Sequence, residues 1–129
     1  MKILIVDDEQ DVEVMFLQKF RREIKSKLLE VEFAFSGEQA LEVLSRFGSP
    51  DVVYVFSDIN MPGMSGLELL ENIKNKFPNI HVSMISAYGD RENYTKAIKS
   101  GAKGFFTKPV DFESLKNEIA ELLTKKENG

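Results

Sequence analysis

The sequence predicts an α/β domain in which helices cover both faces of a doubly wound, five-stranded parallel sheet. Five short apolar runs alternate with helix-length amphipathic stretches, and this alternation requires crossover connections between parallel strands. The runs at 3–6 and 52–56 are apolar throughout, as expected of strands covered on both faces, whereas the run at 31–35 has the pattern of an edge strand. These differences favour the strand order 2-1-3-4-5.

Length and composition fit one globular domain. The 129 residues are 43% hydrophobic and 29% charged, which suffices for a single core. The net charge of −4 argues against direct nucleic-acid binding by this chain, and the absence of cysteine excludes disulfides and zinc–thiolate sites. No apolar run approaches a membrane span and no signal-peptide core is present, so we expect a cytoplasmic protein. Residues 1–124 are expected to form the domain, and 125–129 a polar tail or the start of a linker.

Two helices are predicted between the first and third strands. Apolar residues recur at the spacing of one helix face over 10–27. After the second strand, Ser36 and Gln39 form a capping-box pattern that predicts the next helix start, and the turn at 48–50 ends that helix. The residues expected to face inward are Val12, Met15, Phe16, Phe20 and Ile24 in the first helix, and Ala40, Leu44 and Phe47 in the second.

The third helix is predicted after a loop at 58–64 that follows the third strand. Ser65 and Glu68 form a second capping-box pattern at its start, and Pro78 ends it. The side chains expected to form its buried face are Leu70, Ile73 and Phe77.

The last third of the chain is predicted to contain strands at 80–85 and 104–107, each followed by a helix. Asp90 is expected to cap the fourth helix and Gly101 to terminate it, while Asp111 caps the fifth. The residues expected to face inward are Tyr94, Ala97 and Ile98 in the fourth helix, and Leu115, Ile119, Leu122 and Leu123 in the fifth.

Polar residues at the ends of the predicted strands carry the chemistry. Asp7 and Asp8 follow the first strand, Asp58 comes shortly after the third, Ser86 follows the fourth and Lys108 the fifth. The carboxyl ends of parallel strands lie along one edge of the sheet, where ligands bind. We therefore expect three carboxylates, a hydroxyl and an ammonium group to converge there.

Such a cluster predicts a cation and a phosphoryl group. Two carboxylates about 5 Å apart repel each other by about 3 kcal/mol at an effective dielectric constant of about 20, and a bound cation offsets this. Oxygen ligands without His or Cys favour Mg²⁺, with Mn²⁺ possible. A metal, a lysine and a hydroxyl together form a cradle for phosphoryl oxygens, in which a carboxylate can act as the nucleophile.

Four segments, in this order and at this spacing, resemble the receiver domain of two-component response regulators. The resemblance covers about residues 2–123 and implies the flavodoxin-like receiver fold of a bacterial phosphorelay signalling protein. The segments are Ile3-Leu4-Ile5-Val6-Asp7-Asp8-Glu9, Asp58-Ile59-Asn60-Met61-Pro62-Gly63-Met64-Ser65-Gly66, Ser86-Ala87 and Gly104-Phe105-Phe106-Thr107-Lys108-Pro109.

The resemblance implies that Asp58 is the phosphoacceptor and takes its phosphoryl group from a sensor histidine kinase or a phosphotransfer protein. Asp8 and Asp58 would bind Mg²⁺ directly, together with the backbone carbonyl of Asn60. Asp7 would act largely through a metal-bound water. The domain would be regulatory rather than an enzyme, because it promotes only its own phosphoryl transfer and dephosphorylation.

The resemblance also implies a switch. Lys108 would pair with the phosphoryl oxygens, and Ser86 would donate a hydrogen bond to one of them. Phe105 occupies the family's switch-aromatic position, where its ring can only pack. The Lys108–Pro109 peptide bond is implied to be cis. The output surface would be the fourth helix, fifth strand and fifth helix, about 90–124, which acts on a downstream protein or on an output domain of a longer regulator.

Three positions depart from the commoner family pattern. Ser57 precedes the phosphoacceptor, where an apolar residue is more usual. Tyr88 is bulky enough to shade a phosphoryl group from water, whereas the amide of Asn60 is able to hold a water there. These two residues have opposite expected effects on dephosphorylation.

Three other functions are weighed against the switch. A Mg²⁺-dependent phosphatase often has an Asp-x-Asp pair after its first strand, but here Asp7 and Asp8 are adjacent and the loops are too short for a substrate-covering cap. A flavin-binding domain needs a Ser/Thr/Gly-rich phosphate loop after its first strand, where this sequence has Asp7-Asp8-Glu9 instead. A receiver-shaped interaction module that is never phosphorylated would not need the set of acids, serine and lysine.

Overall fold

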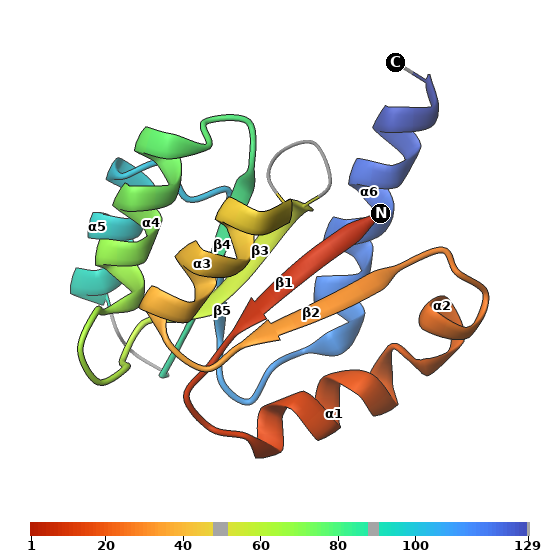
Figure 1. The fold of residues 1–129 in the computed structure, drawn as a ribbon, viewed down its shortest axis with the longest axis horizontal. Helices are drawn as coiled ribbons and strands as arrows, with labels where there is room; N and C mark the ends of the chain where they lie inside the picture. The colour runs from red at the N-terminus through yellow and green to blue at the C-terminus, as the bar shows by residue number, and fades with distance from the viewer. Residues whose placement is uncertain (48–51, 88–90, 129) are drawn as a thin grey trace.

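The structure is a computed structural model that describes residues 1–47, 52–87 and 91–128. Its centre is a sheet of five parallel strands in the order β2-β1-β3-β4-β5, which confirms the predicted topology (Figure 1). β3 extends beyond the predicted 52–56, so Asp58 is its last residue. The strands are β1 (Lys2–Val6), β2 (Glu30–Ala34), β3 (Val52–Asp58), β4 (His81–Ser86) and β5 (Gly104–Thr107).

Helices cover both faces of the sheet. α1, α2 and α6 lie on one face, and α3, α4 and α5 lie on the other (Figure 1). None of the helices in the described part of the chain combines the length and apolar character that a bilayer-spanning segment requires. The helices are α1 (Asp11–Lys19), α2 (Arg21–Lys25), α3 (Gly37–Phe47), α4 (Gly66–Lys76), α5 (Arg91–Lys99) and α6 (Phe112–Asn128).

Each face of the sheet has its own core. Successive side chains of a strand point to opposite faces, so Ile3 and Ile5 join the core on the α1–α6 face and Leu4 joins the other. The α1–α6 core is rich in aromatic rings, and those of Tyr54 and Phe56 are stacked with their centroids 4.3 Å apart. The core under α3, α4 and α5 is mainly aliphatic and contains two buried methionines. Double-sided burial explains why the central strands are continuous apolar runs.

The stretch over 10–27 forms two helices rather than the single helix predicted. Phe20, with φ −101° and ψ 16°, leaves helical geometry between α1 and α2. Its buried ring stacks on Phe16 at 5.9 Å and meets the edge of Phe112 at 6.3 Å. These contacts anchor the point at which the chain changes direction. Met15 is 44% exposed, so its predicted burial is wrong.

α5 contacts the sheet through a narrower face than its sequence predicts. Ala97 is fully buried, but Tyr94 and Ile98 are half-exposed, which corrects two of the three residues expected to face inward. The Tyr94 ring instead meets Phe105 edge-on, with centroids 5.2 Å apart. Gly101, with φ +98°, follows the end of α5 as predicted, in a conformation that favours glycine.

Side-chain caps mark three of the predicted helix starts, those of α3, α4 and α6. At α4, Ser65 and Glu68 make both hydrogen bonds of a capping box. At α3, the Ser36 hydroxyl accepts the backbone N–H of Gln39 at 3.0 Å, as predicted. The Gln39 side chain, however, accepts the N–H of Phe35 rather than that of Ser36, so the reciprocal bond lies one residue earlier than the standard box.

The start of α6 is also capped as predicted, because the Asp111 carboxylate accepts the backbone N–H of Glu113 at 3.1 Å. The predicted turn at 48–50, the cap at Asp90 and the position of Tyr88 lie outside the described residues. So do the side chains of Phe47 and Leu123.

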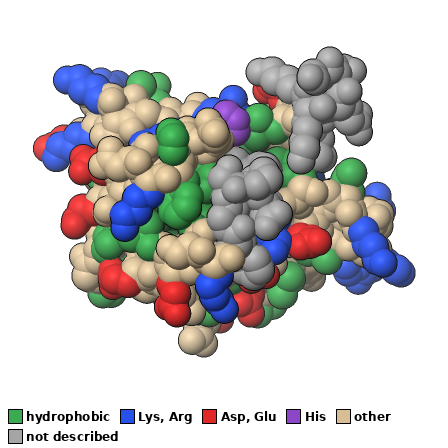
Figure 2. Space-filling view, turned by 45° about the horizontal axis from the view of Figure 1, so that its top comes forward, with side chains coloured by type: hydrophobic (Ala, Val, Ile, Leu, Met, Phe, Trp, Pro, Cys, Tyr) green, Lys and Arg blue, Asp and Glu red, His purple; other side chains and the backbone are tan. Residues whose placement is uncertain are grey.

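Charged side chains of both signs are interspersed on the face shown in Figure 2 rather than gathered by sign. Beneath the surface, one polar pair bridges β3 and β4 on the α6 side of the sheet. The hydroxyls of Tyr54 and Ser83, both fully buried, share a hydrogen bond, and Glu118 of α6 lies 3.5 Å from the Tyr54 hydroxyl. Burial raises the pKa of Tyr54 far above its usual value, so this phenol stays protonated.

Tyr54→Phe should lower the free energy of unfolding by about 1–2 kcal/mol, because the buried Ser83 hydroxyl loses this partner. Urea denaturation at pH 7 measures the change. Tyr94→Phe is the matched control, since that side chain is half-exposed, and it should change stability by less than about 0.5 kcal/mol. Equal effects of the two substitutions would show that the buried pair contributes nothing specific.

Candidate functional site

Three carboxylates meet at the carboxyl edge of the sheet. Asp7 follows β1, Asp8 comes next, and Asp58 ends β3, with one oxygen of each lying within 4.8 Å of the others. The pairing of Val6 with Ser57 in the sheet places Asp7 and Asp58 side by side. Both are only 5% exposed, whereas Asp8 is exposed at the mouth of the cluster.

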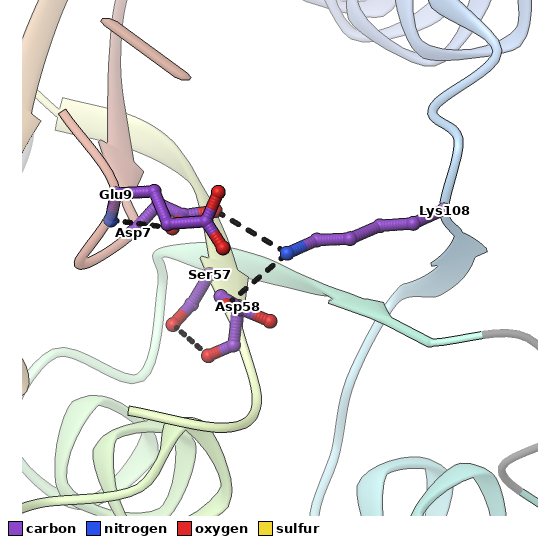
Figure 3. A network of polar contacts seen from close by, with 5 residues as sticks. All are labelled: Asp7, Glu9, Ser57, Asp58 and Lys108. Atoms are coloured by element: carbon purple, nitrogen blue, oxygen red, sulfur yellow. Dashed lines mark hydrogen bonds and ion pairs between the residues drawn. The ribbon is translucent and has the colours of Figure 1, made fainter. Parts of the chain in front are cut away.

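Lys108 extends from beyond β5 into this cluster (Figure 3). Its Nζ lies 3.3 Å from Oδ2 of Asp58 and 3.7 Å from Oδ2 of Asp7. The other oxygen of Asp7 accepts the backbone N–H of Glu9 at 2.9 Å. The backbone N–H of Lys108 donates to the Ser86 carbonyl at 2.8 Å, and the Lys108–Pro109 peptide is cis, as the resemblance implies. The acids and the lysine expected from the sequence are thus brought together.

Burial and the repulsion between neighbouring acids both disfavour the ionised forms of Asp7 and Asp58. Burial raises the pKa of Asp7, and the neighbouring Asp58 raises it further, against the opposing effect of the Glu9 N–H. Burial also raises the pKa of Asp58, although Lys108 opposes it. Burial lowers the pKa of Lys108, but the charges of Asp58 and Asp7 together outweigh this and leave that pKa raised. One ammonium group therefore faces an excess of acidic groups.

The chemistry of the donor set fits a hard divalent cation. All three side chains offer carboxylate oxygens, two of them from a buried position, and the cluster includes no nitrogen or sulfur ligand. Asn60 follows β3 by two residues and is exposed.

The loop after β3 is held by hydrogen bonds from its backbone and from that of the first residue of α4. The N–H of Ile59 donates to a carbonyl of β4 at 3.2 Å, and the N–H of Gly66 donates to the Ile59 carbonyl at 2.8 Å. Glu38, in the first turn of α3, accepts the N–H of Met64 at 3.1 Å. The sequence does not predict the contact between Glu38 and Met64, because a glutamate in the first turn of a helix gives no local indication of a partner 26 residues away.

Of the two residues expected to form the switch, Ser86 lies on β4, next to the strand that ends at Asp58, and Phe105 lies one strand further away, on β5. Ser86 is fully buried at the end of β4, and Asp58 pairs with its neighbour Ile85. Phe105 lies on β5, half-buried, with its ring against Tyr94 of α5.

The fold and the site together define a doubly wound α/β domain with an acidic, lysine-paired ligand site at its switch point. The family model for the response regulator receiver domain matches residues 3–120. The chain belongs to this family of two-component signalling domains, as its sequence motifs indicate.

Individual relatives agree with this assignment. Sporulation initiation phosphotransferase F of Bacillus subtilis is 32% identical over 98% of this chain and 97% of its own length. Chemotaxis protein CheY of Halobacterium salinarum is 32% identical over 95% of this chain and 97% of its own. Response regulator protein PilR of Pseudomonas aeruginosa is longer, since the 35% identical match covers 95% of this chain but only 26% of PilR.

Solved structures show the same fold. The receiver domain protein from Clostridium thermocellum has a TM-score of 0.79 and 29% identity, covering 98% of this chain and 96% of that one. The signal receiver domain of an HD domain-containing protein from Pseudomonas fluorescens has a TM-score of 0.85 and 25% identity, covering 99% and 98%.

The raised pKa values predict how stability depends on pH. Because burial raises the pKa of Asp58 above 3.8, the folded protein binds this proton more tightly than the unfolded chain. The resulting stability is fully present below about pH 3.8 and is lost as the pH rises through the raised pKa. In metal-free buffer, Asp58→Asn should therefore melt at a higher temperature than the wild type at pH 7, and the difference should shrink as the pH is lowered. A wild type that melts above Asp58→Asn at pH 7 would contradict this.

Proposed function

We propose that this domain is a phosphorylation-activated switch in which Asp58 accepts a phosphoryl group from a sensor histidine kinase or a phosphotransfer protein. One observation carries the proposal: a buried strand-end carboxylate lies 3.3 Å from a lysine ammonium and within 4.8 Å of two further carboxylates. Membership of the receiver family supports the same reading.

In the proposed reaction, a carboxylate oxygen of Asp58 attacks the phosphorus of a phosphohistidine. A new O–P bond forms as the P–N bond breaks, and the leaving imidazole nitrogen keeps the electron pair and takes up a proton. Lys108, already beside Asp58, pairs with the phosphoryl oxygens and offsets their charge. A bound Mg²⁺, or Mn²⁺, would be held by Asp8, Asp58 and the Asn60 carbonyl, with Asp7 acting through water, and would supply further positive charge.

The proposed output surface consists of α5, β5 and α6, which are the fourth helix, fifth strand and fifth helix of the sequence prediction. Ser86 would donate a hydrogen bond to the new phosphoryl group, and Phe105 would fill the space that its movement vacates. The contact of Phe105 with the half-exposed Tyr94 supports this route, because it links β5 to the surface of α5.

We further propose that residues 1–124 form the receiver domain, that it works in the cytoplasm, and that it regulates a downstream protein or an output domain of a longer regulator. As a phosphoacceptor it would promote only its own phosphoryl transfer and dephosphorylation. The alternative is a receiver-shaped module that is never phosphorylated.

Incubation with Mg²⁺ and a small acyl phosphate should add one phosphoryl group, on Asp58, and intact mass followed by peptide mapping measures it. Asp58→Asn should abolish the gain because the nucleophile is lost. The control, Glu71→Gln, removes an exposed carboxylate on α4 and should be labelled like the wild type. An unlabelled wild type would favour the unphosphorylated module, and a labelled Asp58→Asn would place the acceptor elsewhere.

Ser86→Ala should still accept the phosphoryl group but should respond poorly to it, because it lacks the hydroxyl that follows the new charge. The measurement compares amide spectra of residues 91–106 with and without a beryllofluoride phosphoryl mimic. Wild type should show shifts in α5 and β5 that the variant largely loses. Equal shifts in both proteins would rule out the Ser86 hydroxyl as the coupling element.

A further inference from the structure

Ser57 places a hydroxyl where the surrounding packing is apolar. The residue is fully buried near the end of β3 and pairs with Val6 on one side and Met84 on the other. These two neighbours, together with Val55 and Ile59 of the same chain segment, belong to the core under α3, α4 and α5. A hydroxyl at such a position costs free energy unless it is hydrogen-bonded, so its partner identifies what the residue does.

The partner is the main chain of the phosphoacceptor. The Ser57 hydroxyl donates to the backbone carbonyl oxygen of Asp58 at 2.9 Å, while Lys108 contacts the carboxylate of the same residue (Figure 3). The first turn of α4 packs closely against this carbonyl, since a Cβ atom at the position of Gly66 would lie 2.1 Å from the oxygen. The bond is therefore made in a tightly packed place.

Both polar groups of the peptide that joins Asp58 to Ile59 are thereby held. Its carbonyl accepts from Ser57, and its N–H donates to the Ile85 carbonyl at 3.2 Å. Fixing this peptide plane fixes the direction in which the Asp58 side chain leaves the backbone. Together with the 3.3 Å contact to Lys108, this restricts the positions that the carboxylate can take.

We propose that Ser57 is a positioning residue for phosphoryl transfer to Asp58, an inference that rests on the proposed function. Its hydroxyl does not touch the reacting atoms. It acts through the carbonyl, by restricting the orientations that the Asp58 carboxylate samples before it attacks phosphorus. Loss of such restraint slows the chemical step and leaves donor binding unchanged.

The test measures the rate of Asp58 phosphorylation as a function of acetyl phosphate concentration, at saturating Mg²⁺. Ser57→Ala should lower the rate at saturating donor by roughly ten-fold and leave the half-saturating donor concentration unchanged. In the metal-free protein, the backbone carbonyl ¹³C resonance of Asp58 should shift, because it has lost the hydroxyl donor.

Two comparisons separate positioning from stability. Ser83→Ala removes another fully buried serine hydroxyl, on the neighbouring strand, and should lower the melting temperature with no effect on the rate. Ser57→Thr and Ser57→Val have the same shape and differ in the hydroxyl, so Thr should react several-fold faster than Val even if both overpack the core.

Two outcomes would overturn the positioning role while leaving the proposed function intact: Ser57→Ala that is labelled on Asp58 at the wild-type rate, or equal rates for Ser57→Thr and Ser57→Val. A wild type that is not labelled on Asp58 at all would overturn the proposed function itself, and the positioning role with it.

Discussion

The repulsion among three carboxylates that the fold forces together is the constraint on which the rest of this structure depends. Asp7 and Asp58 are nearly excluded from water and lie within 4.8 Å of each other and of Asp8. Isolated in solution, such groups would separate. They stay together here because Asp7 and Asp8 follow β1 and Asp58 ends the neighbouring β3 of one hydrogen-bonded sheet, and because Lys108 brings a positive charge from the end of a third strand.

Holding like charges in place requires a rigid frame, and both cores supply it. The strands that carry the acids are buried on both faces, so neither can shift without exposing apolar surface on one side. The loop that follows Asp58 is buried only in part, and individual hydrogen bonds hold it in place. Glu38 ties it to α3, and Gly66 ties it to the start of α4. The site is thus built from a stiff strand end and a loop fastened at separate points.

The sequence predicts this frame well because the signals are local. Continuous apolar runs mark the double-sided strands, and the Ser65–Glu68 pair marks a helix start through contacts within one turn. The acids and Lys108 could be placed together because parallel strands share one carboxyl edge. The errors arise where distant residues decide the outcome. At the break between α1 and α2, the Phe20 ring contacts the ring of Phe112 in α6. The half-exposed Tyr94 of α5 packs its ring against Phe105 of β5.

The unequal composition of the two cores has a mechanical consequence. On the α1–α6 face, flat rings such as Tyr54 and Phe56 stack in parallel and resist being reshaped. On the opposite face, the pliable thioethers of Met61 and Met84 lie among aliphatic side chains and adapt to small changes in volume. A structural change at the carboxyl edge of the sheet therefore borders two different cores, one that resists repacking and one that tolerates it. We therefore expect the face under α3, α4 and α5 to accommodate a small local change more readily than the α1–α6 face.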